Sequence, residues 1–415
     1  MIARHEGRVV LVAGAVPGDT VQAEIRRDRG RFVEAIARSI SLPSPARRAT
    51  PCPVQESCGG CPLMPVGEDD QREAKRRFVV DALERIAKIE DPPVDPIEAP
   101  RPWLGYRGKI EMVFGRDASD RRVFGYHSAG DASVVDVPAC AIADPRLGPL
   151  VDLVRAFFLD DRRAAPPERV AFRASTSGAD RLIAFFGGAS PAATLSAFAR
   201  DAMARERGLT GVVALKAAPG RRGGASTITL AGRPWIEETI LGTSFRVPAG
   251  TFLQVHPRAA DLLGRHLLDA SAGVASVVEL YGGVGGFGLA LARRGAHVTI
   301  VEADAAAVQC GRDAAERAGV ASARFVRGDA GEFLETAPAA DLLVADPPRT
   351  GFGRGVAQGI ARLAPGRIAL VSCDPATLAR DVLGLARAGY RLLRVTPFDL
   401  FPQTAHVEAV AWLTR

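Results

Sequence analysis

Two groups of cysteines in this chain have the types and spacing to do chemistry. Three of the six cysteines crowd together as Cys52-x5-Cys58-Gly-Gly-Cys61, and Cys140 follows later in the chain. Four thiolates can hold tetrahedral zinc or an iron–sulfur cluster. The unequal gaps, without the paired Cys-x2-Cys units of a zinc ribbon, favour a 4Fe–4S cluster, with zinc as the alternative. The spacing therefore predicts a metal site on these four residues.

Cys373 stands alone, directly after a predicted strand over 368–372. Pro375 suits the first residue of a following helix, and a thiol near a helix N-terminus is favoured as the thiolate. Beside a methyl donor, such a thiolate can add across C5–C6 of a pyrimidine and make C5 nucleophilic. A base must then remove the C5 proton, and Glu408, near the start of the last predicted strand, is our candidate. Cys310 is expected to be a small buried hydrophobe in a helix.

The cofactor site is predicted where several strands end. A glycine-rich turn with Gly283 and Gly285 follows the first strand, and the second strand ends in Glu302, which could accept hydrogen bonds from ribose hydroxyls. Asp329 and Asp346 follow the third and fourth strands. Acids at successive strand ends, without a phosphate-gripping loop, favour S-adenosylmethionine. The alternative for each acid is a helix N-cap. Features in register after four successive strands make that explanation insufficient.

These residues require a sheet whose strand ends meet at one edge. From Ser276 onward, apolar strands alternate with helices of ten to fifteen residues, which is typical of a doubly wound parallel sheet. The last two strands, 391–398 and 407–413, have no helix between them. A parallel sheet closed by an antiparallel hairpin predicts an α/β fold of the class I, Rossmann-like methyltransferase type. The five expected parallel strands are 277–281, 297–301, 323–326, 342–345 and 368–372.

Three pieces are expected along the chain. Residues 1–48 read as a small β-barrel with strands near 8–12, 20–26 and 32–40, and they hold nine Arg against five acids. A small basic barrel is a common platform for nucleic acid, so we expect RNA binding there. Residues 49–250 carry the cysteine segment, a helix near 71–89 and a middle α/β domain. Residues 251–415 form the methyltransferase domain.

The composition limits the class of protein, its cellular location and its partners. The chain has 415 residues, 53 Lys+Arg against 47 Asp+Glu, and 47% hydrophobic residues, which excludes a largely disordered chain. The longest apolar stretches, 9–16 and 410–413, fall far short of the ~20 residues of a membrane-spanning helix. We therefore expect a cytoplasmic protein without a membrane partner, and a monomer. A net charge of +6 suits an RNA partner without requiring one.

Together these motifs resemble the RNA uridine-C5 methyltransferase family, in particular the iron–sulfur branch that includes bacterial 23S rRNA enzymes. The resemblance covers nearly the whole chain. Its most specific motifs are the last three in chain order. The motifs are Gly7-Arg8-Val9-Val10, Pro17-Gly18-Asp19-Thr20-Val21, Cys58-Gly59-Gly60-Cys61, Tyr106-Arg107-Gly108-Lys109, Phe252-Leu253-Gln254-Val255, Glu279-Leu280-Tyr281, Asp346-Pro347-Pro348-Arg349, Ser372-Cys373-Asp374-Pro375-Ala376-Thr377-Leu378-Ala379-Arg380-Asp381 and His406-Val407-Glu408.

The resemblance implies roles for single residues. It implies Gln254, Tyr281, Glu302 and Asp346 as cofactor contacts, Cys373 as the nucleophile and Glu408 as the base. It also implies a 4Fe–4S cluster on the four cysteines and an N-terminal barrel of the TRAM type. The chain departs from the family at three places: a shortened or missing strand before Gly7, His256 where Asn is frequent, and Glu279 where Asp is frequent.

The expected function is therefore methylation of uridine C5 in structured RNA, with S-adenosylmethionine as donor and a covalent bond from Cys373 to C6. The expected substrate is 23S rRNA, with tRNA as the alternative. Two other functions stay open at this point. Cytosine-C5 methylation needs the same thiol chemistry, and a non-catalytic iron–sulfur RNA-binding protein could keep the same fold.

Overall fold

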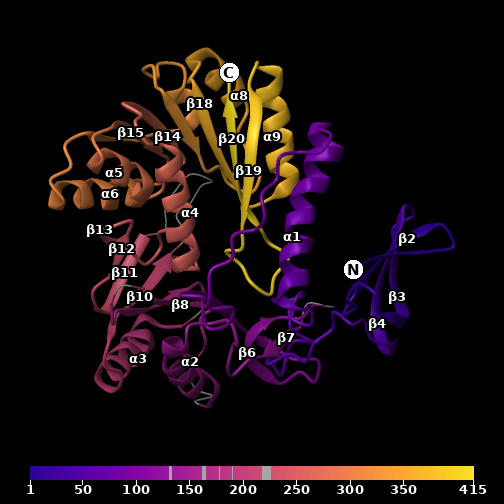
Figure 1. The fold of residues 1–415 in the computed structure, drawn as a ribbon. Coiled ribbons are helices and arrows are strands. Elements are labelled where there is room, and N and C mark those ends of the chain that lie inside the picture. Colours follow the sequence, from indigo (N-terminus) through magenta and orange to yellow (C-terminus); the bar gives the residue numbers. More distant parts are fainter. Residues whose placement is uncertain (130–132, 161–164, 177, 189, 217–225) are drawn as a thin grey trace.

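The computed structural model describes residues 1–415 except 130–132, 161–164, 177, 189 and 217–225. The chain builds an N-terminal sheet, a middle sheet and a C-terminal sheet, with a β-hairpin between the last two (Figure 1). The N-terminal sheet stands to one side of the body, and helix α1 rises between it and the C-terminal sheet. In the described part of the chain, no helix is long and apolar enough to span a bilayer.

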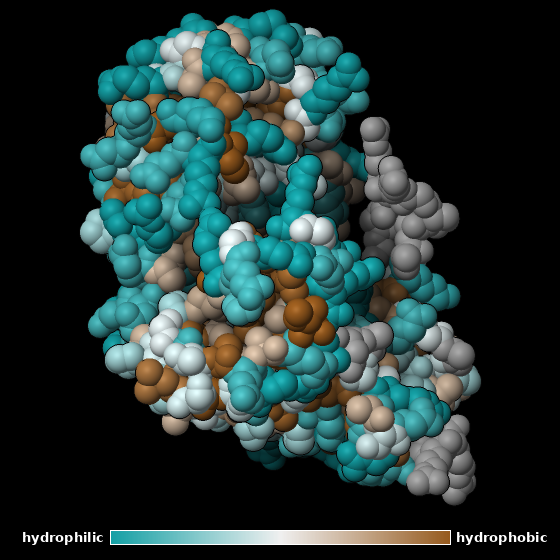
Figure 2. Space-filling model, turned by 90° about the vertical axis from the view of Figure 1, so that its right-hand side faces the viewer, coloured by the Kyte–Doolittle hydropathy of each residue, from teal (hydrophilic) through white to brown (hydrophobic). Residues whose placement is uncertain are grey.

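The N-terminal sheet has four strands in the order β1-β2-β4-β3. A first strand is present but short, since β1 has only four residues. The predicted strands are confirmed, while their closure into a barrel stays a prediction. Figure 2 shows the side of the molecule on which this sheet stands in Figure 1. That face is mostly hydrophilic, with hydrophobic residues in small scattered groups. The strands are β1 Ile2–His5, β2 Arg8–Ala13, β3 Thr20–Asp28 and β4 Phe32–Leu42.

The turn before β3 depends on one carboxylate. Asp19 accepts hydrogen bonds from the backbone N–H of Val16 (2.7 Å) and of Ser44 (2.8 Å). Arg47 donates to the same carboxylate at 2.6 Å. The Arg47 hydrogen bond lowers the pKa of Asp19 to about 2. Asp19 therefore ties the end of β4 to the turn, using a charge-assisted pair that most of the pH range leaves intact.

The middle sheet has seven strands in the order β11-β10-β9-β8-β5-β6-β7. Helices α2 and α3 cover one face over a core rich in stacked and edge-on phenylalanines. Strands and helices alternate here, as the expected middle α/β domain requires. The elements are β5 Lys109–Arg116, β6 Arg122–His127, β7 Val134–Asp136, a 3-10 turn Pro145–Leu147, α2 Gly148–Arg155, a π-helical turn Ala156–Asp160, β8 Arg169–Ala174, β9 Arg181–Phe186, α3 Ala192–Arg205, β10 Leu209–Lys216 and β11 Ser226–Gly232.

A hairpin and a helix that sequence reasoning missed connect the middle and C-terminal sheets. The hairpin is β12 Trp235–Ile240 with β13 Thr243–Pro248, and the helix is α4 Pro257–Ala270. The buried side chains of the hairpin join the core of the C-terminal sheet. Helix α4 begins at Pro257, which suits the first helical position. These elements form one wall of the candidate site.

The C-terminal sheet has the strand order β16-β15-β14-β17-β18-β20-β19, with β14 to β18 parallel and β20 antiparallel to both neighbours. Its two faces are buried under α4, α5 and α6 on one side and α1, α8 and α9 on the other. The predicted doubly wound parallel sheet, closed by an antiparallel hairpin, is confirmed. The elements are β14 Ser276–Leu280, α5 Gly286–Arg293, β15 His297–Glu302, α6 Ala305–Arg317, β16 Ala323–Arg327, α7 Ala330–Phe333, β17 Leu342–Ala345, α8 Val356–Leu363, β18 Arg367–Ser372, α9 Pro375–Arg387, β19 Arg391–Phe398 and β20 Glu408–Thr414.

Helix α1, Glu68–Ala82, continues into a π-helical turn over Leu83–Ala87. Although it precedes the middle sheet in the chain, its buried residues belong to the core of the C-terminal sheet. Figure 1 shows it beside α9 and β19. The segment that follows Cys52, Cys58 and Cys61 is therefore packed on the C-terminal sheet.

Candidate active site

Strand register places Cys373 beside Glu408. In the antiparallel pair of β18 and β20, Ser372 lies opposite Ala409. Cys373 follows Ser372 and Glu408 precedes Ala409, so both stand one step beyond the same pair. Burial, and then the Glu408 carboxylate, raise the pKa of Cys373, which agrees with the placement given by the register. The sheet thus brings a thiol and a carboxyl group together from positions 35 residues apart in the chain.

Asp346 joins this edge from the next strand. It directly follows β17, whose last residue Ala345 lies opposite Leu370 of β18. Burial and the nearby Glu302 raise the pKa of Asp346 to about 6. Burial, and then Asp346, raise the pKa of Glu408 well above its ordinary value. Two neighbouring carboxyl groups, of which Glu408 is 1% exposed, cannot both ionise easily, so this edge holds its protons tightly.

The thiol is not the low-pKa group that we expected from its place at a helix N-terminus. Burial and the negative charge of Glu408 raise the pKa of Cys373. Asp374, the N-cap of α9, turns its side chain to the helix and accepts a hydrogen bond from Thr377 N–H at 2.8 Å. Here desolvation and the acid neighbour outweigh the helix dipole, whose effect is confined to the first turn.

Arg349 was quoted in a motif but given no role by sequence reasoning. Its positive charge lowers the pKa of both Cys373 and Glu408, against the other influences on them. Its backbone carbonyl accepts a hydrogen bond from Thr377 Oγ1 at 3.0 Å, which ties the Asp346–Arg349 loop to α9. The position after Asp-Pro-Pro was the available signal, but only the fold brings its charge close enough to affect the thiol and the base.

The glycine turn after β14 has the strained backbone that a cofactor loop requires. Tyr281, Gly283 and Gly285 all have positive φ, at 59°, 56° and 78°. A Cβ on Gly285 would lie 2.7 Å from the Phe325 ring, so only glycine fits there. Glu302 accepts a hydrogen bond from Gly283 N–H at 3.0 Å and thereby fixes the turn.

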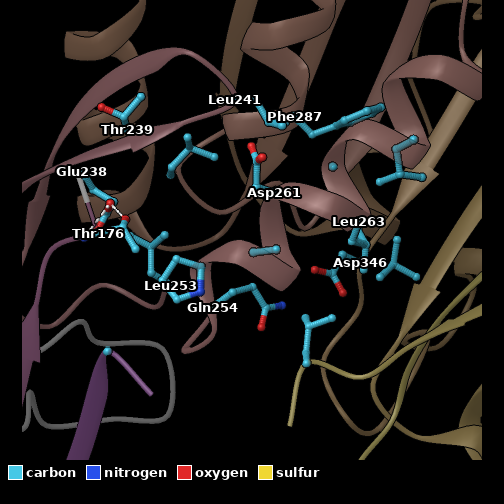
Figure 3. Close-up of a pocket in the computed structure, with 18 of the residues that line it drawn as sticks. Thr176, Glu238, Thr239, Leu241, Leu253, Gln254, Asp261, Leu263, Phe287 and Asp346 are labelled. Carbon is cyan, nitrogen blue, oxygen red and sulfur yellow. Dashed lines mark hydrogen bonds between the residues drawn. The ribbon is translucent and has the colours of Figure 1, made fainter. Parts of the chain in front are cut away.

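Gln254 and Asp346 line a cavity of about 190 Å³ between the middle sheet, the hairpin, α4 and the edge of the C-terminal sheet. Figure 3 shows both polar ends facing the same part of this cavity. Glu279, which sequence reasoning noted only as a departure, also lines it and is 6% exposed. Burial, opposed by a Gly288 backbone hydrogen bond, raises the pKa of Glu279 to about 8. A cationic group of a ligand would suit this acid-rich wall.

Five predicted cofactor residues do not line this cavity: Tyr281, Gly283, Gly285, Glu302 and Asp329. Two of them, Asp329 and Tyr281, have local roles. Asp329 caps α7 and accepts hydrogen bonds from the N–H groups of Gly331 (2.8 Å) and Glu332 (3.3 Å), as the N-cap alternative requires. Tyr281 packs against the core on the α9 side, and burial raises its pKa. Both residues still stand at the carboxyl edge, next to the glycine turn.

His256 also has a structural explanation. Its Nδ1 accepts a hydrogen bond from Ala259 N–H at 3.4 Å and caps α4, and its ring stacks on Tyr106 at 4.7 Å between centroids. Burial lowers the pKa of His256 to about 4. The neutral ring can therefore accept the capping hydrogen bond at neutral pH, in place of the frequent Asn.

The four clustered cysteines are free and partly buried. Burial, followed by the charges of Cys140, Cys58 and Cys52, raises the pKa of Cys61 to about 12, which shows that all four thiols are neighbours. In the described part of the chain, however, no three Cys, His, Asp or Glu side chains converge closely enough to hold a metal ion. The structure therefore brings the four thiols into one region without forming a ligand shell.

Many arginines of the basic N-terminal piece, residues 1–48, are paired with acids of the same piece. Five of its arginines form ion pairs with acids of the same piece: Arg8 with Asp28, Arg26 and Arg38 with Glu24, Arg29 with Glu34, and Arg47 with Asp19. Paired arginines attract phosphates less than free ones. The net excess before residue 49 is thus a weaker indication of RNA binding than its count suggested.

The strand order, the strained glycine turn and the acids at the strand ends define a class I methyltransferase. The family model described as "tRNA (Uracil-5-)-methyltransferase" matches residues 244–415. An uncharacterized RNA methyltransferase of Gloeobacter violaceus is 37% identical, over 99% of this chain and 92% of the relative. The 23S rRNA (uracil(1939)-C(5))-methyltransferase RlmD of Pseudomonas entomophila is 33% identical, over 99% and 90%. The chain belongs to the RNA uracil-C5 methyltransferase family.

A solved structure supports the fold over the whole length. The Pyrococcus abyssi tRNA (uracil-54, C5)-methyltransferase, in complex with S-adenosyl-L-homocysteine, is similar with a TM-score of 0.76. The similarity covers 99% of this chain and 96% of that chain at 23% identity. The N-terminal sheet, the middle sheet and the C-terminal sheet are therefore a shared architecture and not an addition peculiar to this protein.

Proposed function

We propose that this chain methylates C5 of a uridine in 23S rRNA through a covalent bond between Cys373 and C6 of the base. The observation that carries the proposal is the pairing of β18 with β20, which sets Cys373 beside Glu408. The 23S rRNA target rests on the named relative from Pseudomonas entomophila. A tRNA target is the second candidate, because the matching family model and the similar solved structure are both named for tRNA.

In this mechanism the target uridine leaves its stack, since a stacked base exposes neither face to a thiol and a methyl donor together. The Cys373 thiolate adds to C6, and the C5–C6 electrons move to form an enolate with nucleophilic C5. Gln254, Glu302 and Asp346 would hold S-adenosylmethionine, which would supply the methyl group from its sulfonium to C5 and leave as the neutral thioether. Glu408 then removes the C5 proton, the C5=C6 bond re-forms, and Cys373 leaves as a thiolate.

The mechanism is tested with two variants of the full chain and RNA from cells that lack it. Cys373→Ala is expected to bind RNA and S-adenosylmethionine but to form no 5-methyluridine. Glu408→Gln is expected to accumulate a methylated protein–RNA adduct that survives a denaturing gel. Wild-type methylation by Cys373→Ala would refute the covalent scheme, and no adduct with Glu408→Gln would refute the role of the base.

The RNA target is tested separately. Mapping of 5-methyluridine in rRNA and tRNA from cells with and without the chain is expected to show one 23S rRNA site that depends on it. A site that changes only in tRNA would replace the proposed substrate with the second candidate. Nucleoside digestion and mass spectrometry of the same RNA would reveal 5-methylcytidine if the base were a cytosine.

We also propose that Cys52, Cys58, Cys61 and Cys140 hold a 4Fe–4S cluster. The donor chemistry fits, because four free thiols share one partly buried region. When bound, such a cluster would cross-link the cysteine segment to the middle domain. Protein purified without oxygen is expected to contain about four iron and four sulfide per chain. Zinc in place of iron, or no metal in the native protein, would refute this proposal.

A further inference from the structure

The loop that leads into Glu408 is unusually buried for a connection between two strands. It spans residues 399–407, between Phe398 at the end of β19 and Glu408 at the start of β20. Asp399, Gln403 and Thr404 within it are 0%, 1% and 5% exposed. Connecting segments normally run over the surface, where water satisfies their polar groups. Here the protein itself must satisfy them, and Figure 1 shows the loop beside the lower end of α1.

Gln403 is the residue at which most of these contacts converge. Its backbone N–H donates to Gln71 Oε1 (3.1 Å), and its backbone carbonyl accepts from Leu63 N–H (3.0 Å). Its side-chain Oε1 accepts from Arg48 Nη2 and from Gln71 Nε2, both at 3.0 Å. Its Nε2 donates to the carbonyl oxygen of Trp103 at 3.3 Å. Each hydrogen-bonding group of this residue therefore has a partner from the N-terminal half of the chain.

The backbone of Gln403 is held in an unfavourable conformation. Its φ is +72°, in the left-handed region that favours glycine. Such a conformation persists in a non-glycine residue only when its surroundings over-determine it, and it is concentrated at functional sites. Glycine would satisfy the backbone at this position but would lose the contacts to Arg48, Gln71 and Trp103. The side chain is therefore the reason that the strained backbone carries glutamine.

A second anchor holds the start of the same loop. Lys75 of α1 forms an ion pair with Asp399 at 2.6 Å and donates to the carbonyl oxygen of Phe401 at 2.9 Å. The hydroxyl of Tyr106 donates to the carbonyl oxygen of Pro402 at 3.0 Å. Contacts from α1 and from the segment before the middle sheet thus fix the part of the loop that precedes Gln403.

The fixed loop leads to Glu408 through a short chain of turns. Thr404 N–H donates to the carbonyl oxygen of Phe401 (3.1 Å), and His406 N–H donates to Thr404 Oγ1 (3.2 Å). Glu408 then pairs with Phe398 across the hairpin. Four residues separate Gln403 from Glu408, and two local hydrogen bonds restrict them. Movement of Gln403 would therefore reach the carboxyl group that faces Cys373.

We propose that Gln403 is a positioning residue for proton removal, because it holds the loop that sets the direction of the Glu408 carboxyl group. This inference rests on the proposed role of Glu408 as the base. The alternative is that Gln403 only fills and stabilises the interior. The two explanations differ in the step that they affect: positioning concerns decay of the methylated adduct, whereas general stability concerns folding, RNA binding and adduct formation equally.

The test uses Gln403→Gly and Gln403→Glu in the full chain, purified without oxygen, with total RNA from a strain that lacks the gene and methyl-labelled S-adenosylmethionine. Glycine keeps the backbone conformation and removes the side chain. Glutamate keeps the shape and the acceptor but loses the donor to Trp103. Adduct formation in a single turnover and steady-state turnover are measured separately, with Glu408→Gln as the positive control and Cys373→Ala as the negative control.

We expect Gln403→Gly to lower turnover about 10- to 100-fold, as a misplaced catalytic group does, with adduct formation within about twofold of the wild-type rate. The labelled adduct should accumulate on a denaturing gel, and Gln403→Glu should give an intermediate level. The inference would be overturned if Gln403→Gly had the turnover of the wild type, or if its rate of adduct formation fell in proportion to its turnover. If Gln403→Gly does not fold, the isosteric Gln403→Glu decides in the same way.

The controls separate this inference from the proposed function. If Glu408→Gln forms no adduct, the role of Glu408 as base is wrong, and the inference about Gln403 falls with it. If Glu408→Gln accumulates adduct while neither variant of Gln403 does, the proposed function stands and only the positioning role is refuted.

Discussion

Replacement of Glu279 by Gln should stabilise the ligand-free protein, by an amount that grows as the pH rises from 4.5 to 8. Glu279 is buried at the end of β14, its Oε2 has no hydrogen-bond partner among the described residues, and Gly288 N–H supplies one hydrogen bond to the carboxyl group. Burial raises its pKa from 4.5 to about 8, and Asp346 and Glu302 add to this. Because the folded state binds this proton more tightly than the unfolded chain does, Glu279 favours folding at low pH and loses that contribution as pH rises.

The size of the effect follows from the same two values. One pKa unit corresponds to about 1.4 kcal/mol. Between pH 4.5, the ordinary value, and pH 8, the folded value, the free energy of unfolding should fall by about 4 kcal/mol on account of Glu279. Gln has the shape of the protonated acid and no charge to bury. Glu279→Gln should therefore match the wild type at pH 4.5 and exceed it by about 4 kcal/mol at pH 8.

Urea denaturation followed by circular dichroism, at each pH unit from 5 to 8, measures this difference directly. The matched control is Glu335→Gln, which changes an exposed glutamate of the same domain. The control should run parallel to the wild type across the range. If the curves of Glu279→Gln and the wild type were also parallel, the carboxyl group would titrate near its ordinary pKa and the reasoning from burial would be refuted.

Three further outcomes can be stated briefly. Lys75→Met leaves Asp399 as an unpaired buried charge and should lower the free energy of unfolding, measured by urea denaturation, by about 3–5 kcal/mol. The double variant Lys75→Met with Asp399→Asn should recover most of this loss; the same loss in the single and double variants would contradict the explanation. Gly285→Ala should cost about 2–5 kcal/mol through positive φ and its clash with Phe325, and should abolish S-adenosylmethionine binding by calorimetry; normal binding would show that the turn adapts. Cys310→Ala should cost about 1 kcal/mol and leave iron content and methylation unchanged; lost iron would give this buried thiol a role in the metal site.

The parts of the fold with a strong repeating pattern could be predicted from the sequence. The five parallel strands and the final hairpin are marked by apolar runs at regular spacing, and all are present within a residue or two. The hairpin of β12 and β13 was missed because Trp235–Ile240 places two glutamates in mid-strand, and Glu238 is nevertheless 7% exposed. Helix α4 was missed because its first turn follows a motif that was interpreted only for its chemistry.

The chemistry of the site was less predictable than its location. The sequence places Cys373 at the end of one strand and Glu408 at the start of another, and the register then makes them neighbours. Their pKa values depend on groups that no local pattern reveals, namely the desolvation of the edge and the charges of Asp346 and Arg349. For this reason the helix-dipole argument for Cys373 gave the wrong direction, and the position of Arg349 became informative only in the fold.

The raised pKa values at the carboxyl edge have a common cause that also bears on the proposed reaction. Glu279 and Glu408 are buried near other acids, so each holds its proton more tightly than in water. A cation at this edge favours their ionised forms, and S-adenosylmethionine is cationic at its sulfur, whereas its demethylated product is neutral there. Glu408 is thus ionised more easily beside the donor than beside the product. When the C5 proton must be removed, the donor's positive charge is gone, and the higher pKa then makes Glu408 the stronger base.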